Sequence, residues 1–455
     1  MLNSTLLPHF VTDLAYYDTI PRTLYQELPT KCCKGEKRSR SLAQAAVTLC
    51  RYLLRRAALA PYAMLLFDSN QACDLQQLDQ AWSADPTFAL LPARSQIDPD
   101  WMTSALAALP APYQRHHFAL LTSGSTGEPK LIIGERRRSE QLARALHTLQ
   151  QGEEVAETLL LLPLHYSYAF VNQWLWSRVM GRRLVLTQGL SKPDLLRQQL
   201  QQAEQAMLCM VGAQVPLLHT FFEGAVFPGI IRLHFAGGRF PQESLEFLHT
   251  LFPHAEVFNN YGCAEAMPRM TLRSAEASPL AYNIGRALPG IELRTDEEGH
   301  ILFRSPYQAR AFYDRSGLHL LADDDWTPSG DLGYPTADGS WELLGRSNEV
   351  FKRFGEKISL SQLASTIFAV WQGEATFYRE SDPLGEEGYV LVLAPRPIES
   401  ELRALLRALR HHWSRSHWPL RIEGMERLPR LSNQKVDSRA VAASRDSETI
   451  WRQRI

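Results

Sequence analysis

The chain lacks the features that would place it in several large protein classes. No segment approaches the roughly 20 uninterrupted apolar residues that span a bilayer, and the apolar run at 159–163 is far too short. The first ten residues lack the charged head and long apolar core of a secretory signal. The six cysteines show no C-x-x-C spacing that would indicate a zinc or redox site. We therefore expect a cytoplasmic protein without a membrane span.

The balance of charged residues excludes a second group of functions. The 48 basic and 49 acidic side chains leave a net charge of −1, so no global charge draws the chain to nucleic acid or to a membrane surface. The 45% of apolar and 21% of charged residues are ordinary for a globular protein. With 455 residues, the chain is long enough for two to four domains, or for one large and one small domain.

Residues 122–130, with the sequence TSGSTGEPK, predict a loop that handles phosphate. Glycines let the backbone approach a polyphosphate closely and adopt the positive φ angles that turn several N–H groups toward one anion. The hydroxyl groups donate hydrogen bonds, and Lys130 adds a positive charge. The loop is not a Walker loop, because no Gly-Lys-Ser/Thr closes it. A solvated linker is the alternative, but apolar runs at 117–121 and 131–133 flank the loop and favour a connection between buried strands.

Between about residues 115 and 345, short apolar runs alternate with helical patterns, which predicts an α/β fold with parallel sheets. The expected strands are 159–162, 184–186, 207–211, 230–235 and 257–259, and the expected helices include 41–60 and 194–205. After Arg346 the composition changes, and arginines recur at helical spacing around residues 402–407. We interpret that basic stretch as a solvated helix face. A docking surface for an acidic carrier protein is the alternative.

Three segments offer groups suited to a nucleotide. Tyr261 presents a flat face for a purine, and Glu265 presents a hard carboxylate for magnesium. The alternative is a glutamate that caps a helix. Asp331 has two acceptor oxygens, which suit a vicinal diol, although an ordinary turn would also use an aspartate here. The pair Gly237-Gly238 lets a planar ring lie against the backbone.

These motifs, taken in order, resemble those of the acyl-adenylate-forming superfamily, which includes acyl- and aryl-CoA synthetases, peptide-synthetase adenylation domains and luciferases. The resemblance covers about residues 118–440 and implies a mixed α/β fold. A large N-terminal domain of mixed sheets with packed helices (1–345) would precede a small mobile C-terminal α+β domain (346–455). The matching segments are TSGSTGEPK at 122–130, AGGRF at 236–240, NNYGCAE at 259–265, SGD at 329–331, GRSN at 345–348 and LPRLSNQKVDSR at 428–439.

The resemblance also implies roles for individual residues, with ATP and Mg²⁺ as cofactors. Lys435 takes the place of the catalytic lysine, Glu265 holds magnesium, and Thr126 completes the catalytic set. Asn348 is the hinge, and His165 or Tyr166 is the aromatic gate of the acyl pocket. The nucleotide-binding residues would be Thr122, Ser123, Gly124, Ser125, Gly127, Lys130, Gly237, Gly238, Arg239, Asn259, Tyr261, Gly262, Asp331 and Arg346.

The implied reaction activates a small carboxylic acid to acyl-AMP and then transfers the acyl group to a phosphopantetheine thiol on an acyl carrier protein. A CoA ligase is the first alternative. The second is a degenerate protein that binds nucleotide or acyl-AMP without turnover, because Ala264 and Gln434 depart from the family pattern. Peptide-synthetase domains of this superfamily place an aspartate near the aromatic gate to hold the α-amino group of the substrate, and this chain has none between His165 and Trp176. The resemblance therefore implies an aryl or unsaturated acyl acid rather than an amino acid.

The role implied for Lys435 makes a prediction about the two half-reactions. Lys435→Ala should slow acyl-AMP formation on the order of 10²–10³-fold, because a charge contact made in the transition state is lost. Transfer to the thiol from supplied acyl-AMP should be largely spared. Single-turnover assays of each half-reaction test this, and an equal loss in both would contradict the role.

Overall fold

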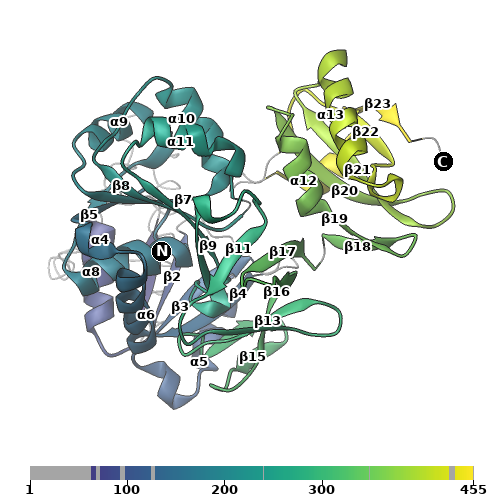
Figure 1. Cartoon of the computed structure of the whole chain (residues 1–455). Helices are drawn as coiled ribbons and strands as arrows, with labels where there is room; N and C mark the ends of the chain where they lie inside the picture. Colours follow the sequence, from purple (N-terminus) through teal and green to yellow (C-terminus); the bar gives the residue numbers. More distant parts are fainter. Residues whose placement is uncertain are drawn as a thin grey trace, which may run out of the picture. The chain divides into compact units, whose positions relative to one another are not determined.

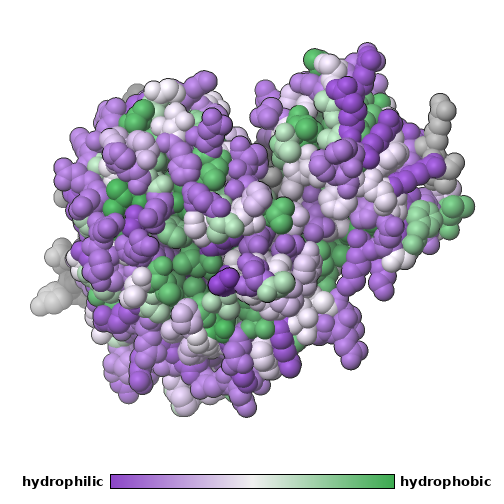
Figure 2. All heavy atoms as spheres, in the orientation of Figure 1, coloured by the Kyte–Doolittle hydropathy of each residue, from purple (hydrophilic) through white to green (hydrophobic). Residues whose placement is uncertain are grey.

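The computed structural model describes residues 63–67, 72–92, 98–123, 129–238, 240–347, 349–429 and 436–453 (Figure 1). The helix expected at 41–60 lies outside these residues. No helix among the described residues is long and apolar enough to cross a membrane. Charged and polar side chains cover much of the face drawn in Figure 2, with apolar patches between them.

The first sheet has six strands in the order β1-β2-β3-β4-β14-β15. Strands β1, β2 and β3 run parallel, whereas β3 and β4 pair antiparallel, with Thr122 opposite Lys130. Residues 122–130 therefore join two neighbouring strands of one sheet, as the flanking apolar runs predicted, and these two strands are antiparallel. The strands are β1 Ala63–Phe67, β2 Phe88–Pro92, β3 His117–Ser123, β4 Pro129–Glu135, β14 Ala311–Asp314 and β15 Gly317–Leu320.

The second sheet has eleven strands in the order β12-β13-β16-β17-β11-β10-β9-β8-β7-β5-β6. Its parallel half runs from β6 to β9, and antiparallel pairing begins at β9–β10. The expected parallel sheet is thus confirmed for five strands, and the remainder is antiparallel. The bounds are β5 Glu157–Leu160, β6 Arg183–Leu186, β7 Ala206–Met210, β8 Ile230–Phe235, β9 Glu256–Tyr261, β10 Thr271–Ser274, β11 Asn283–Ala287, β12 Glu292–Thr295, β13 His300–Arg304, β16 Thr327–Pro335 and β17 Trp341–Arg346.

Helices separate and cover these two sheets (Figure 1). One core packs the six-stranded sheet through α4, α6, α8 and a π-helix onto the parallel strands. A second core packs α9, α10 and α11 on the opposite face of those strands. A third packs α5 on the outer face of the six-stranded sheet. The bounds are α4 Ala72–Ser83, α5 Pro99–Ala107, α6 Arg136–Leu149, α7 Ser167–Ala169, the π-helix Phe170–Leu175, α8 Trp176–Met180, α9 Pro193–Gln201, α10 Val215–Phe222 and α11 Leu245–Leu251. Helix α9 ends at Gln201, four residues before the helix end expected at Gln205, which adopts a positive φ of 47°.

The C-terminal part is small and α+β. Strand β21 alternates its side chains, so that one face packs on α12 and α13 and the other packs on Met425, Leu428 and Val441. The basic stretch around 402–407 lies in α13, whose apolar residues Leu405 and Leu409 are buried. The elements are β18 Val350–Arg353, β19 Glu356–Ser359, α12 Leu360–Phe368, β20 Glu374–Ser381, β21 Glu387–Ala394, α13 Glu399–His412, β22 Arg421–Gly424, α14 Ser438–Ala443 and β23 Glu448–Arg452.

The core between the two sheets makes a prediction about stability. Phe118 is fully buried, and its ring centroid lies 5.5 Å from that of Trp82 and 5.0 Å from that of Phe170. Phe118→Ala should lower the free energy of unfolding by about 3–5 kcal/mol, because it leaves a cavity in close-packed surroundings. Thermal and denaturant unfolding measure the loss. The matched control is Phe354→Ala, since that ring is 55% exposed. Equal effects of the two substitutions would contradict this account of the core.

Candidate active site

The carboxyl end of β9 brings an aromatic side chain to a buried carboxylate. The Tyr261 hydroxyl donates to Asp331 Oδ2 at 2.6 Å, and Arg346 Nε lies 3.0 Å from Asp331 Oδ1. The pairing of β16 with β17 places Asp331 directly opposite Arg346. Burial raises the pKa of Asp331, and the Arg346 charge and the Tyr261 hydrogen bond oppose that shift. The aspartate is thus held by two donors from two different elements.

The turn that follows Tyr261 is closed so tightly that only glycine fits at its start. A Cβ atom at Gly262 would lie 1.9 Å from the carbonyl oxygen of Pro268. The Met270 amide donates to the Tyr261 carbonyl at 2.8 Å, which fixes the two ends of the turn. We call residues 262–269 the site turn. Its close contact requires the glycine that the sequence motif contains.

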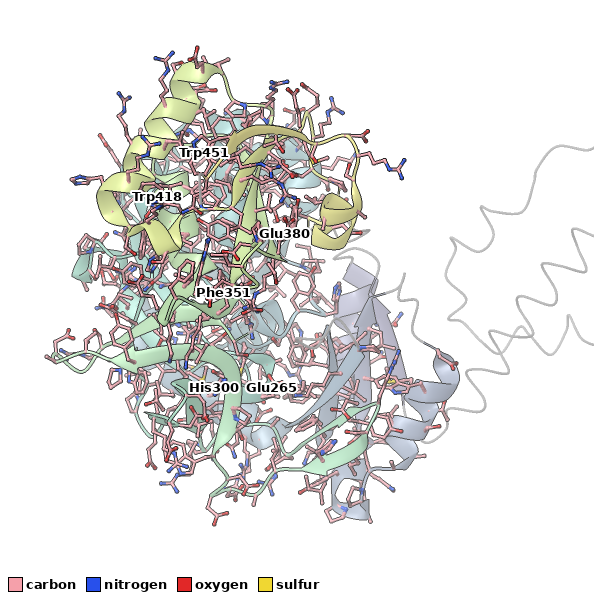
Figure 3. All side chains as sticks on the ribbon, turned by 90° about the vertical axis from the view of Figure 1, so that its right-hand side faces the viewer. Glu265, His300, Phe351, Glu380, Trp418 and Trp451 are labelled. Carbon is pink, nitrogen blue, oxygen red and sulfur yellow. The ribbon has the colours of Figure 1, made fainter. Side chains whose placement is uncertain are left out.

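The site turn directs Glu265 toward the start of β4. Lys130 Nζ donates to Glu265 Oε1 at 2.7 Å, and the two side chains are 21% and 18% exposed. Figure 3 labels Glu265 beside the six-stranded sheet that carries Lys130. Lys130 Nζ also lies 3.8 Å from the centroid of the Phe312 ring, a cation–π contact. A predicted phosphate-binding lysine and a predicted metal ligand therefore meet, although 135 residues separate them in the chain.

Other predicted nucleotide-binding residues lie in or directly after the strands β3, β8 and β9. Ser123 is the last residue of β3, and Thr122 precedes it. The Thr122 Oγ1 donates to the Lys130 carbonyl at 3.3 Å. Gly237 follows β8 with a φ of 75°, a conformation that favours glycine, and Gly238 comes next. Asn259 is buried, and its Nδ2 donates to the Asn283 carbonyl at 3.3 Å. The residues Gly124, Ser125, Thr126, Gly127, Arg239, Asn348 and Lys435 lie outside the described residues, and their roles stay predictions.

The two candidates for the aromatic gate follow β5. His165 lies 4.6 Å from Tyr166, ring centroid to ring centroid, in an edge-to-face arrangement. Burial lowers the pKa of His165 to about 4, so this ring is neutral at physiological pH. Tyr166 is 43% exposed, and the phenol of Tyr168, two residues later, is buried. The sequence motif did not single out Tyr168.

The sequence reasoning also missed Asn172 and Arg269. Asn172 lies in the π-helix, an uncommon conformation that is frequent at functional sites. Arg269 ends the site turn, and its Nη1 donates to Asn172 Oδ1 at 2.6 Å. The only signal in the sequence was the presence of polar residues inside apolar segments, Asn172-Gln173 within 169–175 and Arg269 between two methionines.

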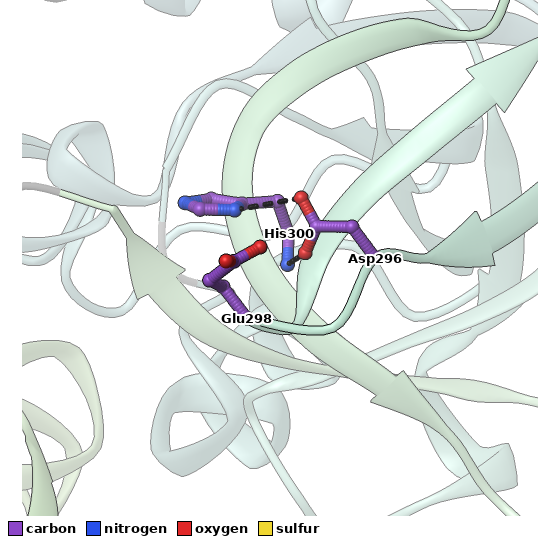
Figure 4. Close-up of side chains that lie close together, drawn as sticks. All are labelled: Asp296, Glu298 and His300. Carbon is purple, nitrogen blue, oxygen red and sulfur yellow. Dashed lines mark hydrogen bonds and ion pairs between the residues drawn. The ribbon is translucent and has the colours of Figure 1, made fainter.

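A further group of metal-ligating side chains lies in the turn between β12 and β13. Asp296, Glu298 and His300 each place one ligand atom within 4.8 Å of the others (Figure 4). His300 Nδ1 lies 2.9 Å from Asp296 Oδ2, and the His300 amide donates to Asp296 Oδ1 at 2.8 Å. These bonds are those of a turn that satisfies its own polar groups.

The family model described as AMP-binding enzyme matches residues 43–313, more than half of the chain. The chain belongs to the AMP-binding enzyme family. The match includes the loop at 122–130, the site turn and Phe312, whereas Asp331 and Arg346 lie beyond it.

Individual relatives are distant. The chain is 26% identical to delta-poly-L-ornithine synthetase from Acinetobacter baumannii, over 72% of this chain and 26% of that protein. It is 24% identical to 2-hydroxy-7-methoxy-5-methyl-1-naphthoate–CoA ligase from Streptomyces carzinostaticus, over 72% and 62%. It is 23% identical to D-alanine–D-alanyl carrier protein ligase from Staphylococcus haemolyticus, over 71% and 70%. The chain thus spans less than two thirds of the length of the first two.

The fold has a close counterpart among solved structures. The O-succinylbenzoate coenzyme A synthetase of Bacillus subtilis, in complex with AMP, superposes with a TM-score of 0.65 at 19% identity. The superposition covers 87% of this chain and 91% of that structure. The shared architecture is the mixed α/β N-terminal part followed by the small α+β part.

The geometry around Asp331 predicts how much the Tyr261 hydroxyl group contributes to stability. Tyr261→Phe removes the donor to a buried carboxylate, so the free energy of unfolding should fall by about 1.5–3 kcal/mol. Denaturant unfolding measures the change. Tyr313→Phe is the matched control, because its ring packs on Trp101 and its hydroxyl makes no hydrogen bond to a described residue. A loss no greater than that of the control would show that Asp331 does not depend on Tyr261.

Proposed function

We propose that this protein uses ATP to activate a carboxylic acid as an acyl-adenylate and then transfers the acyl group to a thiol. The observation that carries the proposal is the convergence of charges around the site turn. Lys130 and Glu265 meet at 2.7 Å on one side, and Tyr261, Asp331 and Arg346 meet on the other. Cationic and anionic groups at one strand end suit a nucleotide with its metal.

The residues present fit magnesium and a nucleotide. Glu265 provides one hard carboxylate, and magnesium is commonly held by one or two carboxylates together with substrate phosphates. When bound, the metal would neutralise phosphate charge. Asp331 offers carboxylate oxygens to the ribose hydroxyls, and Arg346, already beside it, would contact the same sugar. Lys130 would exchange its ion pair with Glu265 for the phosphates of the nucleotide.

In the first step, an oxygen of the substrate carboxylate attacks the α-phosphorus of ATP. The bond from the α-phosphorus to the oxygen that bridges it to the β-phosphorus breaks, so that pyrophosphate leaves. Positioning and charge neutralisation dominate such a transfer. Lys435 would hold the carboxylate and phosphate together. In the second step, the thiol sulfur attacks the acyl carbon, AMP leaves, and the thiol proton is released. We propose that residues 346–455 form a mobile domain that turns about Asn348 between the two steps.

For the acceptor, we propose a phosphopantetheine thiol on a carrier protein, with CoA as the alternative. The curated relatives include a ligase of each kind. For the acid, the aromatic pair His165 and Tyr166 supports an aryl or unsaturated acyl substrate. The absence of an aspartate between His165 and Trp176 argues against an amino acid.

The proposal is tested by acid-dependent release of pyrophosphate from ATP, with hydroxylamine to trap acyl-AMP, across benzoic, cinnamic, fatty and amino acids. Release with one class is the expected result. Parallel reactions with CoA and with a phosphopantetheine-loaded carrier protein then identify the acceptor by the thioester formed. ATP binding without pyrophosphate release for any acid would favour a degenerate nucleotide-binding protein.

Glu265 provides a sharper test of the site. Glu265→Gln keeps the size of the side chain but removes its charge, so the Mg²⁺ concentration for half-maximal activity should rise and the rate should fall on the order of 10²-fold or more. Initial rates over a magnesium titration measure both. Glu246→Gln, on the exposed face of α11, is the matched control. An unchanged magnesium dependence in Glu265→Gln would contradict the role of this residue as metal ligand.

A further inference from the structure

Six polar side chains gather where the site turn meets the parallel strands. Cys209 in β7 lies opposite His234 in β8, and His234 lies opposite Phe258 in β9. Asn260 shares the face of Phe258, because side chains alternate along a strand. The remaining members come from α7, the π-helix and the site turn. We call Tyr168, Asn172, Cys209, His234, Asn260 and Arg269 the buried polar cluster, and none of the six is more than 9% exposed.

The buried polar cluster is only partly satisfied. Asn260 Nδ2 donates to the Tyr168 hydroxyl at 3.0 Å, and Arg269 donates to Asn172 at 2.6 Å. With its side-chain amide turned over, Gln150 also accepts from Arg269. Three atoms, namely His234 Nε2, Asn260 Oδ1 and Arg269 Nε, have no hydrogen-bond partner among the described residues. Buried polar atoms without partners are uncommon and call for an explanation.

Arg269 differs from the other buried arginines in the charged groups that surround it. Arg232 lies 2.9 Å from Glu154, and Arg353 lies 3.3 Å from Asp382. Nearby carboxylates also support the charge of Arg136 and Arg273. No acidic side chain among the described residues does so for Arg269, which is fully buried. A buried charge normally has a counter-ion, because removing a charge from water costs several kcal/mol.

The other members of the cluster do not supply a negative charge. Burial raises the pKa of Cys209 to about 12 and raises that of Tyr168 as well, so both stay protonated. Burial lowers the pKa of His234, which keeps its ring neutral. Burial also lowers the pKa of Arg269, to about 10, which still leaves it charged at neutral pH. The cluster therefore carries a single positive charge.

The cluster adjoins the candidate active site along the chain. Arg269 and Glu265 share the site turn, and Asn260 directly precedes Tyr261. Tyr168 lies two residues beyond the candidate gate residue Tyr166. An acid whose carboxylate reacts near Lys130 and Glu265 would extend along this turn toward Arg269.

We propose that Arg269 binds a second carboxylate of the substrate, so that the acid activated by this protein is a dicarboxylic acid. The inference rests on the proposed function and narrows its substrate class. A carboxylate on the free Nε edge of the guanidinium would form the charge-assisted pair for which arginine is suited. It would also supply the negative charge that the buried polar cluster lacks.

The test compares acids that differ only in the second carboxylate. The pairs are terephthalic with 4-methylbenzoic acid, isophthalic with 3-methylbenzoic acid, and glutaric with pentanoic acid. Acid-dependent pyrophosphate release gives kcat/KM for each. The wild-type protein should prefer at least one diacid over its partner on the order of 10²-fold, as sites built around a buried polar contact do. Preference for the monoacid in every pair would overturn the proposal.

Arg269→Met should remove that preference, whereas Arg269→Lys should restore part of it. The matched control is Arg273→Met. Arg273 is another buried arginine, and it donates hydrogen bonds to two neutral acceptors, Gln242 and the Ser278 carbonyl. This variant should keep the preference for the diacid. If Arg269→Met does not fold, the ratios of kcat/KM between diacid and monoacid in the wild-type protein and in Arg269→Lys still test the inference. Equal losses for both acids of a pair would assign Arg269 a structural role and overturn the inference. Absence of pyrophosphate release with any acid, mono or di, would instead contradict the proposed function.

Discussion

The site depends on the closure of one short turn. Gly262 lets the backbone pass so close to Pro268 that no side chain fits between them, and the Met270 amide bonds back to the Tyr261 carbonyl. Because both ends are fixed, Tyr261, Glu265 and Arg269 point to three different elements within nine residues of chain. They reach β16, β4 and the π-helix respectively. A change in this turn would therefore affect all three contacts together.

Each of those three contacts includes a charged side chain that is partly or fully buried. The three differ in how that charge is balanced. Asp331 has Arg346 beside it and a hydroxyl donor on its other oxygen. Glu265 and Lys130 neutralise each other, and the Phe312 ring supports the lysine. Arg269 has only neutral acceptors among the described residues. The first two pairs are complete without a ligand, whereas Arg269 leaves one charge unbalanced, and this asymmetry is the basis for assigning the pairs to the nucleotide and Arg269 to the acid in our proposals.

The sequence predicted the elements whose signals are local. The run at 230–235 coincides with β8, and the runs at 159–162 and 207–211 differ from β5 and β7 by one or two residues at each end. The partners of Glu265 and Asp331 could not be predicted from the residues alone, because the site turn brings Glu265 to Lys130 and strand pairing places Arg346 opposite Asp331. The antiparallel half of the large sheet escaped prediction for the same reason. Asn172 and Arg269 were missed because a polar residue inside an apolar segment does not indicate its partner, and 97 residues of chain separate these two.

The departure at Ala264 bears on whether the protein is a catalyst or a degenerate binder. Ala264 packs against the core between the two sheets. The neighbouring Glu265 nevertheless pairs with Lys130, and Asp331 pairs with Arg346. Replacing a buried ion pair with well-packed apolar residues is often neutral or stabilising, so a chain that no longer used these pairs would lose little by replacing them. Their presence in geometry suited to a nucleotide, together with an unbalanced arginine in the site turn, favours a working acid-activating enzyme over a protein that only binds.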